Sequence, residues 1–431
     1  MQRRVAADVS LHGVPAALPA EAPEVNPFGT WLLEMGFDLF LCSAYRREIL
    51  LPDGFHIAPG TLIASNHQRD VDGPMLGTLL VQRRGLRFKW PLPFYATRED
   101  LFRPGILSRL TVHWPRPLSA LLGHVSLAWF FPLGHAEPMR RVREFTLGEA
   151  LRALSDAGCG DEDCASLLNA RGRRELAVTP GDARLRDVLD HADARFEAWW
   201  GLRRLTLPAL QKIAPAFHAT VSAQLAHFAG RLDRGHCVYY APEGTISMDG
   251  HFDRIRAGFF RLAHAAEAPP WIQPMALSYD SLAPGRSRVV LRIGRHFRAD
   301  TSLDRRAFDT TLRRSILSLA PITPSHLLAR FLSQGPERFT RHEFTDWLAR
   351  NLAALHAQGA SLDPLWSRVS IQALARRRLR WMVRKRLLAR DGSGFRNTCP
   401  RGAEPGWQHP ANVVRYLDNS LADLAPDLQA C

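Results

Sequence analysis

Short apolar runs alternate with amphipathic segments over the first two thirds of the chain. The apolar runs have the length of strands and fall at residues 61–64, 86–96, 126–133, 237–241, 271–278 and 288–293. Helical periodicity marks the segments at residues 31–49, 73–82, 101–110 and 259–268. Because strands that alternate with helices are typical of α/β folds, we expect an α/β domain over about residues 50–300.

A long stretch inside this domain, about residues 145–228, is charged and mostly helical in pattern. Its two clearest helical segments are at 148–155 and 182–205, and residues 169–181 between them have the composition of a linker. The pattern predicts a helical insertion over about residues 150–225.

Strand signals stop after Leu303. Helical patterns at 308–319, 340–355 and 365–390 predict a helical C-terminal region. After Asp391 the chain is rich in Gly and Pro, which predicts a weakly ordered tail with one short helix at 413–424. The expected organisation is a loose leader at 1–28, the α/β domain at 29–300, the helical region at 301–390 and the tail at 391–431.

Two segments bear on membrane insertion. The N-terminus has Arg3 and Arg4 but no apolar core behind them, so we interpret it as a leader and not as a signal peptide. The longest uncharged window, 117–136, approaches the length of a membrane span. It contains Pro132 and separates the two motifs described below, which a span would place on opposite sides of a bilayer. We therefore predict a buried helix and strand there.

The charge balance favours acidic partners. The 431 residues include 56 Lys and Arg against 42 Asp and Glu, a formal net charge of +14. Nucleic acid, an anionic membrane surface and a polyanionic cofactor all satisfy this charge. The densest basic run, residues 376–386, spreads its cations around the predicted helix and leaves no clean apolar face. No nucleic-acid-binding motif accompanies it, which disfavours nucleic acid as a partner. Contact with anionic headgroups, contact with the phosphates of a carrier or cofactor, and a solvated helix stay open.

Six cysteines are too few and too scattered for a disulfide framework. Cys159 and Cys164 are the closest pair, and no second cysteine pair or nearby histidine pair completes a zinc site. We expect reduced thiols and no bound metal.

A histidine and a carboxylate stand five positions apart in Asn66-His-Gln-Arg-Asp-Val-Asp72, where a predicted strand turns into a predicted helix. At this spacing the carboxylate can hold the imidazole in one tautomer while the other ring nitrogen acts as a base. Asp70 is a competing carboxylate, and a purely structural histidine is the alternative. The surrounding strand, glycine and helix favour a functional site.

A second motif, Ala241-Pro-Glu-Gly-Thr-Ile-Ser247, follows another apolar run. Gly244 would let the backbone approach a ligand closely, and exposed amides in this turn could face an anion or a developing oxyanion. An acidic turn capped by Thr245 is the alternative interpretation.

The two motifs, in this order, resemble motifs one and three of the glycerolipid acyltransferase family, the lysophosphatidate acyltransferase type. That family has an HX4D motif preceded by asparagine, and a Phe-Pro-Glu-Gly-Thr-Arg-Ser motif. The loop at 250–258 resembles the family's loop before a Lys/Arg-x-Gly turn, and Gln273-Pro-Met-Ala-Leu277 resembles its fourth motif. The resemblance covers about residues 60–300, where it implies a mixed sheet flanked by helices.

The resemblance also implies roles for individual residues. His67 corresponds to the catalytic base and Asp72 to the residue that orients it. Glu243, Gly244 and Thr245 correspond to residues that shape the acceptor site.

Three further residues are assigned to substrate binding: Asn66 in the first motif, Arg69, and Arg140 as an arginine near the second motif. The sequence departs from the family in the first motif, where Arg69 replaces a serine. Two phosphate-binding arginines of the family are also altered: Ile246 replaces the one after Glu-Gly-Thr, and His135 follows the short apolar strand at which the second motif has the other. An arginine–phosphate contact is strong and often bidentate, so its loss suggests an acceptor other than a phosphate monoester. Arg69 is a candidate for supplying the charge from a new position.

The resemblance predicts an acyltransferase of lipid metabolism and phospholipid biosynthesis, which moves a fatty acyl group from a coenzyme A or acyl carrier protein thioester to a lipid hydroxyl or amine. The expected partners are the acyl thioester donor, a lipid acceptor, an anionic membrane surface and an acyl carrier protein. The expected location is cytoplasmic and peripheral, at the inner face of the membrane. The alternatives are a non-catalytic lipid- or protein-binding member of the family and an acyl thioester hydrolase.

Overall fold

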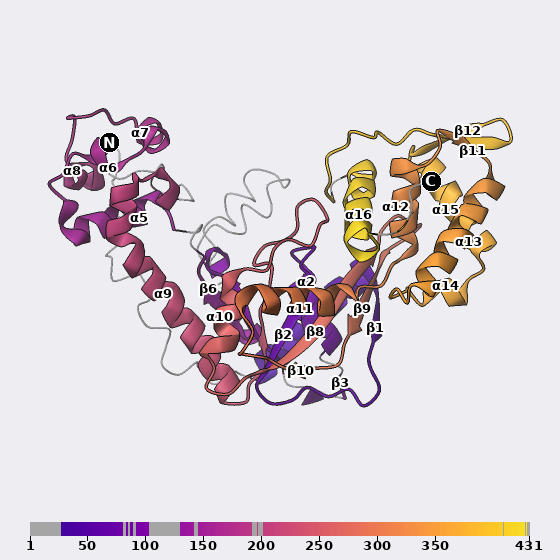
Figure 1. Ribbon diagram of the computed structural model, residues 1–431, viewed down its shortest axis with the longest axis horizontal. Coiled ribbons are helices and arrows are strands. Elements are labelled where there is room, and N and C mark those ends of the chain that lie inside the picture. Colours follow the sequence, from indigo (N-terminus) through magenta and orange to yellow (C-terminus); the bar gives the residue numbers. More distant parts are fainter. Residues whose placement is uncertain are drawn as a thin grey trace. The chain divides into compact units, whose positions relative to one another are not determined.

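The computed structural model describes residues 27–80, 83–84, 87–88, 92–102, 130–141, 145–191, 196, 201–407, 409–426 and 428. It divides into two compact units. We call residues 96–228 the insertion unit, and residues 27–95 together with 229–431 the main unit (Figure 1).

The main unit is built on a mostly parallel sheet. Its strands run in the order β1-β9-β8-β2-β7-β5, and β10 pairs with β8. The pairs β1–β9, β2–β8, β2–β7 and β5–β7 are parallel, whereas β8–β9 and β8–β10 are antiparallel. The strand bounds are β1 Tyr45–Leu50, β2 Thr61–Ser65, β5 Phe94–Arg98, β7 Val238–Tyr239, β8 Trp271–Asp280, β9 Ser287–Ile293 and β10 Phe297–Arg298. The predicted α/β class is thereby confirmed.

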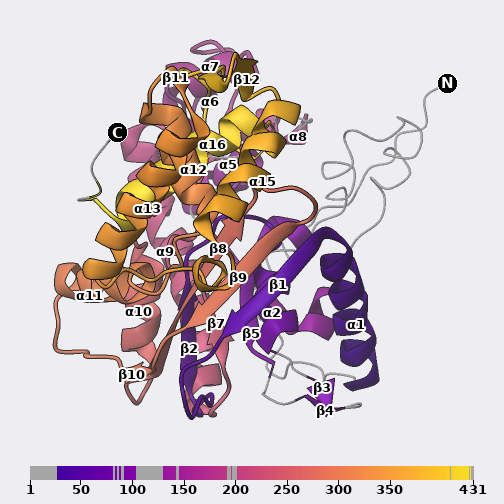
Figure 2. The ribbon, with the colours of Figure 1, turned by 90° about the vertical axis from the view of Figure 1, so that its right-hand side faces the viewer.

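Helices flank both faces of this sheet. Helix α1 (Pro27–Ala44) packs with α2 (Asp72–Leu80) on one side, and α10 (Ala257–Ala265) packs with α11 (Arg305–Leu317) on the other (Figure 2). Every residue of β2 is buried, as is expected of a central strand covered on both faces. The sequence predicted β2, α2, α10 and α11 within a few residues.

Pro274 lies inside β8, a central strand, where its missing N–H would normally break a ladder. The strand tolerates it because β10 pairs with Trp271 and Ile272, whereas β9 pairs only from Met275 onward. Pro274 therefore falls between two antiparallel ladders. The fourth motif, residues 273–277, lies within this strand, in agreement with the strand expected at 271–278.

Two predictions about local structure were wrong. The helix expected at 31–49 ends at Ala44, and the chain continues as β1, an edge strand whose pairing with β9 is a tertiary contact. Within the strand expected at 126–133, Phe131–Gly134 forms a 3-10 helix that starts with a proline in its first turn. Residues 103–129, which hold most of the uncharged window and of the helix expected at 101–110, lie outside the described residues.

The C-terminal region of the main unit is mostly helical but also contains a small antiparallel sheet. Its helices are α12 Pro324–Gln334, α13 Arg341–Ala357, α14 Leu365–Arg368, α15 Ile371–Arg384 and α16 Pro410–Leu424. The three strands, in spatial order β11-β13-β12, are β11 Arg338–Phe339, β13 Gly394–Asn397 and β12 Leu388–Asp391. These short strands had escaped prediction because their apolar runs are only one or two residues long.

The short helix predicted at 413–424 in the tail is confirmed as α16, which begins at Pro410. This helix packs along α12, and its apolar positions recur at helical spacing and are buried: Val413, Val414, Leu417 and Leu421. Burial of one apolar stripe stabilises a helix that local propensity alone leaves marginal.

Helix α15 carries the basic run, for which the sequence had predicted no clean apolar face. The helix buries one clean face, which includes Leu374, Leu379 and Met382. The opposite face exposes the arginines Arg376, Arg377, Arg380 and Arg384. Arg378 is the exception among the cations because it is buried with a partner, as described below.

The insertion unit is helical over most of its described length. Its elements include β6 Ala136–Met139, α5 Leu147–Leu154, α6 Cys164–Leu167, α7 Ala170–Leu176, α8 Leu185–Asp190 and the first part of α9 Leu207–Asp233. A core that includes Phe145, Leu151, Leu185 and Phe217 holds these short helices together. Among the helices that the structure describes, none has the length and apolar character needed to cross a bilayer.

Candidate active site

The loop between β2 and α2 brings His67 and Asp72 together. The buried strand β2 ends at Ser65, and α2 begins at Asp72, so the loop is six residues long. His67 Nδ1 lies 3.1 Å from Asp72 Oδ2. Asp70, the competing carboxylate, is exposed. Asp72 is therefore the partner of His67.

The Asp72 carboxylate is completely buried and accepts four hydrogen bonds. Its Oδ2 accepts the backbone N–H of Gln68 at 2.6 Å and of Arg69 at 2.8 Å, besides His67 Nδ1. Its Oδ1 accepts the phenol of Tyr279 from β8. A buried charge needs such compensation, and here the loop backbone supplies half of it.

The hydrogen bond to Asp72 fixes the tautomer of His67. A carboxylate oxygen only accepts, so Nδ1 carries the proton, and Nε2 of the neutral ring holds a free lone pair. The His67 side chain is 22% exposed, whereas that of Asp72 is 0% exposed. A partly exposed imidazole with a buried orienting carboxylate can take a proton from a substrate hydroxyl or amine.

Asn66 fastens this loop to the sheet. Its Nδ2 donates to the carbonyl oxygen of Leu277 at 2.9 Å, and its Oδ1 accepts the Leu277 N–H at 2.8 Å. The side chain is buried and pairs with β8 as a backbone strand would. This arrangement explains the asparagine as a positioning residue, and its predicted contact with substrate stays a prediction.

Glu243 ties the second motif to the first. Its Oε1 accepts the backbone N–H of His67 at 2.8 Å, and its Oε2 accepts that of Asp253 at 2.8 Å. The side chain is 1% exposed. Burial raises the pKa of Glu243 to about 8, although the two backbone hydrogen bonds act in the opposite direction. The carboxyl group therefore holds the histidine backbone in place, and its assignment to the acceptor site stays a prediction.

The rest of the second motif forms a tight turn. Gly244 has φ of +63°, which favours glycine, and a Cβ there would lie 3.2 Å from Arg256 Cγ. Its N–H donates to the carbonyl oxygen of Ala241 at 2.9 Å, so this amide is used within the turn. Thr245 is partly exposed and stays a candidate for substrate contact. Ser247 N–H donates to the His67 carbonyl oxygen at 2.9 Å, which adds a second tie between the motifs.

Arg69 lies in an aromatic box and not in open solvent. Its guanidinium carbon is 3.6 Å from the ring centroid of Trp407 and 4.3 Å from that of Tyr279. Its two terminal nitrogens donate to Tyr45 Oη and Ser281 Oγ, each at 3.1 Å. Such cation–π and hydrogen-bond contacts occupy the group that the sequence had offered to a substrate phosphate.

Arg140 belongs to the insertion unit and is buried there. Its guanidinium pairs with Glu99 at 2.8 Å and with Glu149, and it stacks on Phe145 at 4.1 Å. These contacts account for the side chain within its own unit. Its predicted role in substrate binding stays a prediction.

The C-terminal segment of the main unit contacts both motifs. Trp407 donates its indole N–H to the carbonyl oxygen of Gln68 at 3.1 Å. Tyr416 packs against Trp407 with ring centroids 4.4 Å apart, and its hydroxyl donates to the Ser247 carbonyl oxygen at 3.4 Å. Asn419 Nδ2 donates to the Asp249 carbonyl oxygen at 2.9 Å.

Sequence reasoning missed these residues. Trp407 and Tyr416 are single aromatic residues in a segment rich in Gly and Pro, and no local pattern marks them as part of a site. Tyr279 was within reach of a prediction, because it lies two residues beyond the fourth motif on a buried strand.

Substrate must approach His67 from its exposed side. The cavity on the inner side of the loop is lined by residues that include Asn66, Gln68 and Glu243, and it measures about 20 Å³. That volume holds about one water molecule. This cavity is therefore too small for a lipid or a thioester.

Buried ion pairs continue from the end of β8 into the C-terminal helices. Asp280, which follows Tyr279, accepts hydrogen bonds from Ser325 on α12 and from Arg378 Nη2 on α15, the latter at 2.6 Å. Burial alone would raise the pKa of Asp280, but Arg378 and Ser325 together lower it below its usual value. The strand thus presents Tyr279 to the loop between β2 and α2, and Asp280 to the helices.

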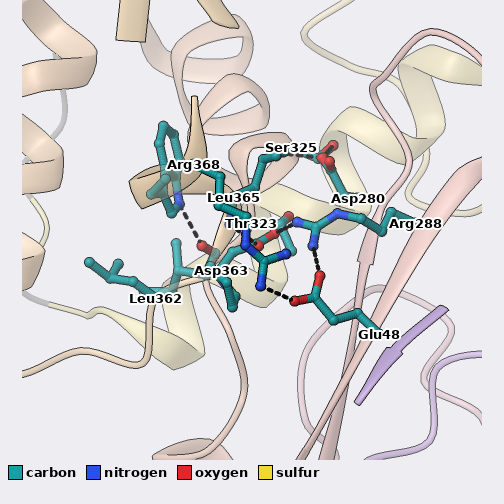
Figure 3. Close-up of polar contacts among 12 residues, drawn as sticks. Glu48, Asp280, Arg288, Thr323, Ser325, Leu362, Asp363, Leu365 and Arg368 are labelled. Carbon is teal, nitrogen blue, oxygen red and sulfur yellow. Dashed lines mark hydrogen bonds and ion pairs between the residues drawn. The ribbon is translucent and has the colours of Figure 1, made fainter. Parts of the chain in front are cut away.

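A second group of charges stabilises the same edge of the sheet. Arg288 on β9 pairs with Asp363 and, at 2.7 Å, with Glu48 on β1 (Figure 3). Arg368 on α14 reaches Glu48 at 2.9 Å. These contacts join β1 and β9 to the helices that follow them in sequence.

In the described part of the chain, no group of three or more His, Cys, Asp or Glu side chains is arranged to hold a metal ion. Comparison with protein-family models gave no match, and comparison with curated proteins gave none either.

Proposed function

We propose that this protein is an acyltransferase that moves a fatty acyl group from a coenzyme A or acyl carrier protein thioester to a lipid hydroxyl or amine. One observation carries the proposal. His67 presents a partly exposed ring whose Nδ1 is held 3.1 Å from a buried carboxylate with three further donors. The order of the motifs along the chain, and their resemblance to glycerolipid acyltransferases, supports the same assignment.

The proposed reaction uses His67 as a general base. Nε2 takes the proton of the acceptor hydroxyl or amine as its oxygen or nitrogen attacks the thioester carbonyl carbon. The tetrahedral intermediate collapses when the carbon–sulfur bond breaks, and the imidazolium returns the proton to the leaving thiolate. Asp72 stabilises the imidazolium and keeps the ring oriented throughout. The step needs no redox partner.

The surroundings of Arg69 and Ile246 favour an acceptor without a phosphate monoester. The Arg69 guanidinium is enclosed by aromatic rings and donates to Tyr45 and Ser281, while Ile246 has no charge to offer. A lipid alcohol or amine fits this site better than a lysophosphatidate. We place the enzyme on the cytoplasmic side of the membrane, as a peripheral protein attracted by its positive charge to anionic lipid.

The test is acyl transfer from a radiolabelled long-chain acyl thioester, with a total lipid extract as the pool of acceptors. Wild type, His67→Ala and Asp72→Asn are compared, and Asp70→Asn serves as the matched control because Asp70 is exposed. We expect labelled lipid from wild type and from the control. We expect a loss of at least a hundredfold from the two site variants, which is the usual size of a general-base contribution.

The product distinguishes the alternatives. Labelled free acid without labelled lipid indicates a thioester hydrolase that uses the same base on water. No thioester consumption, or equal product from wild type and His67→Ala, overturns the assigned base and favours a lipid- or protein-binding role.

A further inference from the structure

An open groove in the main unit lies beside the catalytic loop but outside the site described above. It has a volume of about 510 Å³, within the range of small-molecule sites. Its lining consists of Ser281, Ala283, Pro284, Gly285, Ser287, Trp381, Arg384 and Lys385. The loop after β8 thus forms one side, and the C-terminal end of α15 forms the other.

The groove is cationic without an internal counter-charge. Arg384 and Lys385 are both exposed, and neither forms an ion pair with a residue in the described part of the chain. Arg376 and Arg380 precede Arg384 at intervals of four along the same face of α15, and like charges at this spacing repel one another. A bound anion would relieve this repulsion, and no carboxylate of the described chain does so.

The opposite side of the groove offers hydroxyl groups and an open turn. Ser281 Oγ and Ser287 Oγ lie 2.8 Å apart. Gly285 has φ of +84°, and no atom lies within 4 Å of where its Cβ would be, so the turn leaves room beside the hydroxyls. Cations facing hydroxyls across an open groove are suited to the oxygens of a phosphate ester.

One hydroxyl connects the groove to the candidate active site. Ser281 Oγ accepts a hydrogen bond from Arg69 Nη2 at 3.1 Å, and the Arg69 backbone N–H donates to Asp72. Arg69 therefore links the lining of the groove to the loop that holds the base.

We infer that this groove binds the phosphate groups of the acyl thioester donor, whether these belong to free coenzyme A or to the phosphopantetheine arm of a carrier protein. The inference rests on the proposed function for the identity of the ligand. It assigns Arg384 and Lys385 to the donor phosphates. It also gives a role to the end of the basic run, for which the sequence left headgroups, carrier phosphates and plain solvation open.

Binding of coenzyme A, measured by calorimetry without turnover, tests the inference. The double variant Arg384→Ala/Lys385→Ala is compared with Arg306→Ala/Arg350→Ala, which removes two exposed arginines elsewhere on the main unit. We expect coenzyme A to bind wild type and the control alike, and to bind the groove variant at least tenfold more weakly. Charge-assisted hydrogen bonds of this kind are each worth about tenfold in affinity. In turnover assays we expect KM for the thioester to rise while kcat stays near wild type.

Further arms distinguish the sources of the phosphate. Holo acyl carrier protein that competes with coenzyme A, while the apo form does not, shows that the arm of a carrier occupies the groove. If neither form of the carrier protein competes with coenzyme A, the groove is assigned to the free cofactor. Equal affinity of the groove variant and wild type for coenzyme A overturns the inference. It is also overturned if the variant loses only its binding to phosphatidylglycerol vesicles, since the cations then serve a membrane surface.

The inference and the proposed function fail separately. Coenzyme A binding does not depend on His67, so His67→Ala should bind it as wild type does. Groove-dependent binding without acyl transfer would contradict the proposed function alone. Acyl transfer with an unchanged KM in the groove variant would contradict the groove alone.

Discussion

Trp407 donates its indole N–H to the backbone carbonyl of Gln68, 3.1 Å away, across 339 positions of sequence. Gln68 follows the candidate base directly, and its own N–H donates to Asp72. A residue near the end of the chain therefore holds the peptide next to His67. The C-terminal segment is part of the site's support and not an appendage.

Replacing Trp407 tests this support. Trp407→Phe keeps a ring against Arg69 but loses the N–H donor, whereas Trp407→Leu loses both. We expect kcat to fall about tenfold for Phe and further for Leu, because a less rigid loop places His67 less accurately against the substrate. Thermal unfolding should show a stability loss of roughly 2 kcal/mol for Leu. If the two variants keep wild-type kcat, the contact is structural only.

Tyr279→Phe removes the phenol that donates to Asp72 Oδ1. Burial and the nearby Asp72 hold the pKa of Tyr279 well above its usual value, so the phenol stays a donor at neutral pH. Without it, one oxygen of the buried Asp72 carboxylate loses its donor. We expect kcat/KM to fall roughly tenfold or more, since hydrogen bonds to charged groups are worth about 1.5–3 kcal/mol.

Comparison of activity with stability separates orientation from folding in this variant. The fall in kcat/KM should be seen in Tyr279→Phe under conditions where thermal unfolding shows the protein to be folded. Tyr45→Phe is the control, since its hydroxyl contacts Arg69 and not Asp72. Equal kcat/KM in Tyr279→Phe and Tyr45→Phe would argue against a role for the phenol in orienting the dyad.

Glu243 should make stability fall with rising pH. Burial raises its pKa from 4.5 to about 8 in the folded protein. Between these pH values, Glu243 therefore keeps a proton in the folded state that it has lost in the unfolded chain. The contribution is fully present below pH 4.5 and is lost as the pH rises to about 8. The free energy of unfolding of wild type and of Glu243→Gln is measured with denaturant at several pH values in this range. Its slope against pH should differ between the two proteins by the equivalent of up to one proton. Parallel curves would show that Glu243 is ionised in the fold.

Arg378→Met leaves Asp280 buried without its cation. We expect unfolding to become easier by about 3–5 kcal/mol, the usual effect of removing one partner of a buried pair. The double variant with Asp280→Asn should recover much of this loss, because the amide needs no counter-ion. Denaturant titration of the two variants checks both expectations. A double variant no more stable than Arg378→Met would mean that Arg378 acts through packing alone.

The sequence by itself predicted much of the scaffold. Continuous apolar runs such as 61–64 and 271–278 identify central strands, because a strand covered on both faces has no polar side. His67 and Asp72 were also within its reach, since a five-residue separation across a strand–helix turn is a local property of the chain. The structure then distinguished Asp72 from Asp70 by burial.

Only the tertiary structure decided what surrounds the pair. Tyr279, Trp407 and Tyr416 reach the site because strand pairing and the packing of α16 on α12 bring distant segments together. No local pattern encodes such contacts. The same holds for Arg69, a plausible phosphate ligand in sequence that the fold encloses between aromatic rings. The pairing of His67 with Asp72 follows from residues close together in sequence, while the rigidity of their loop depends on residues up to 339 positions away.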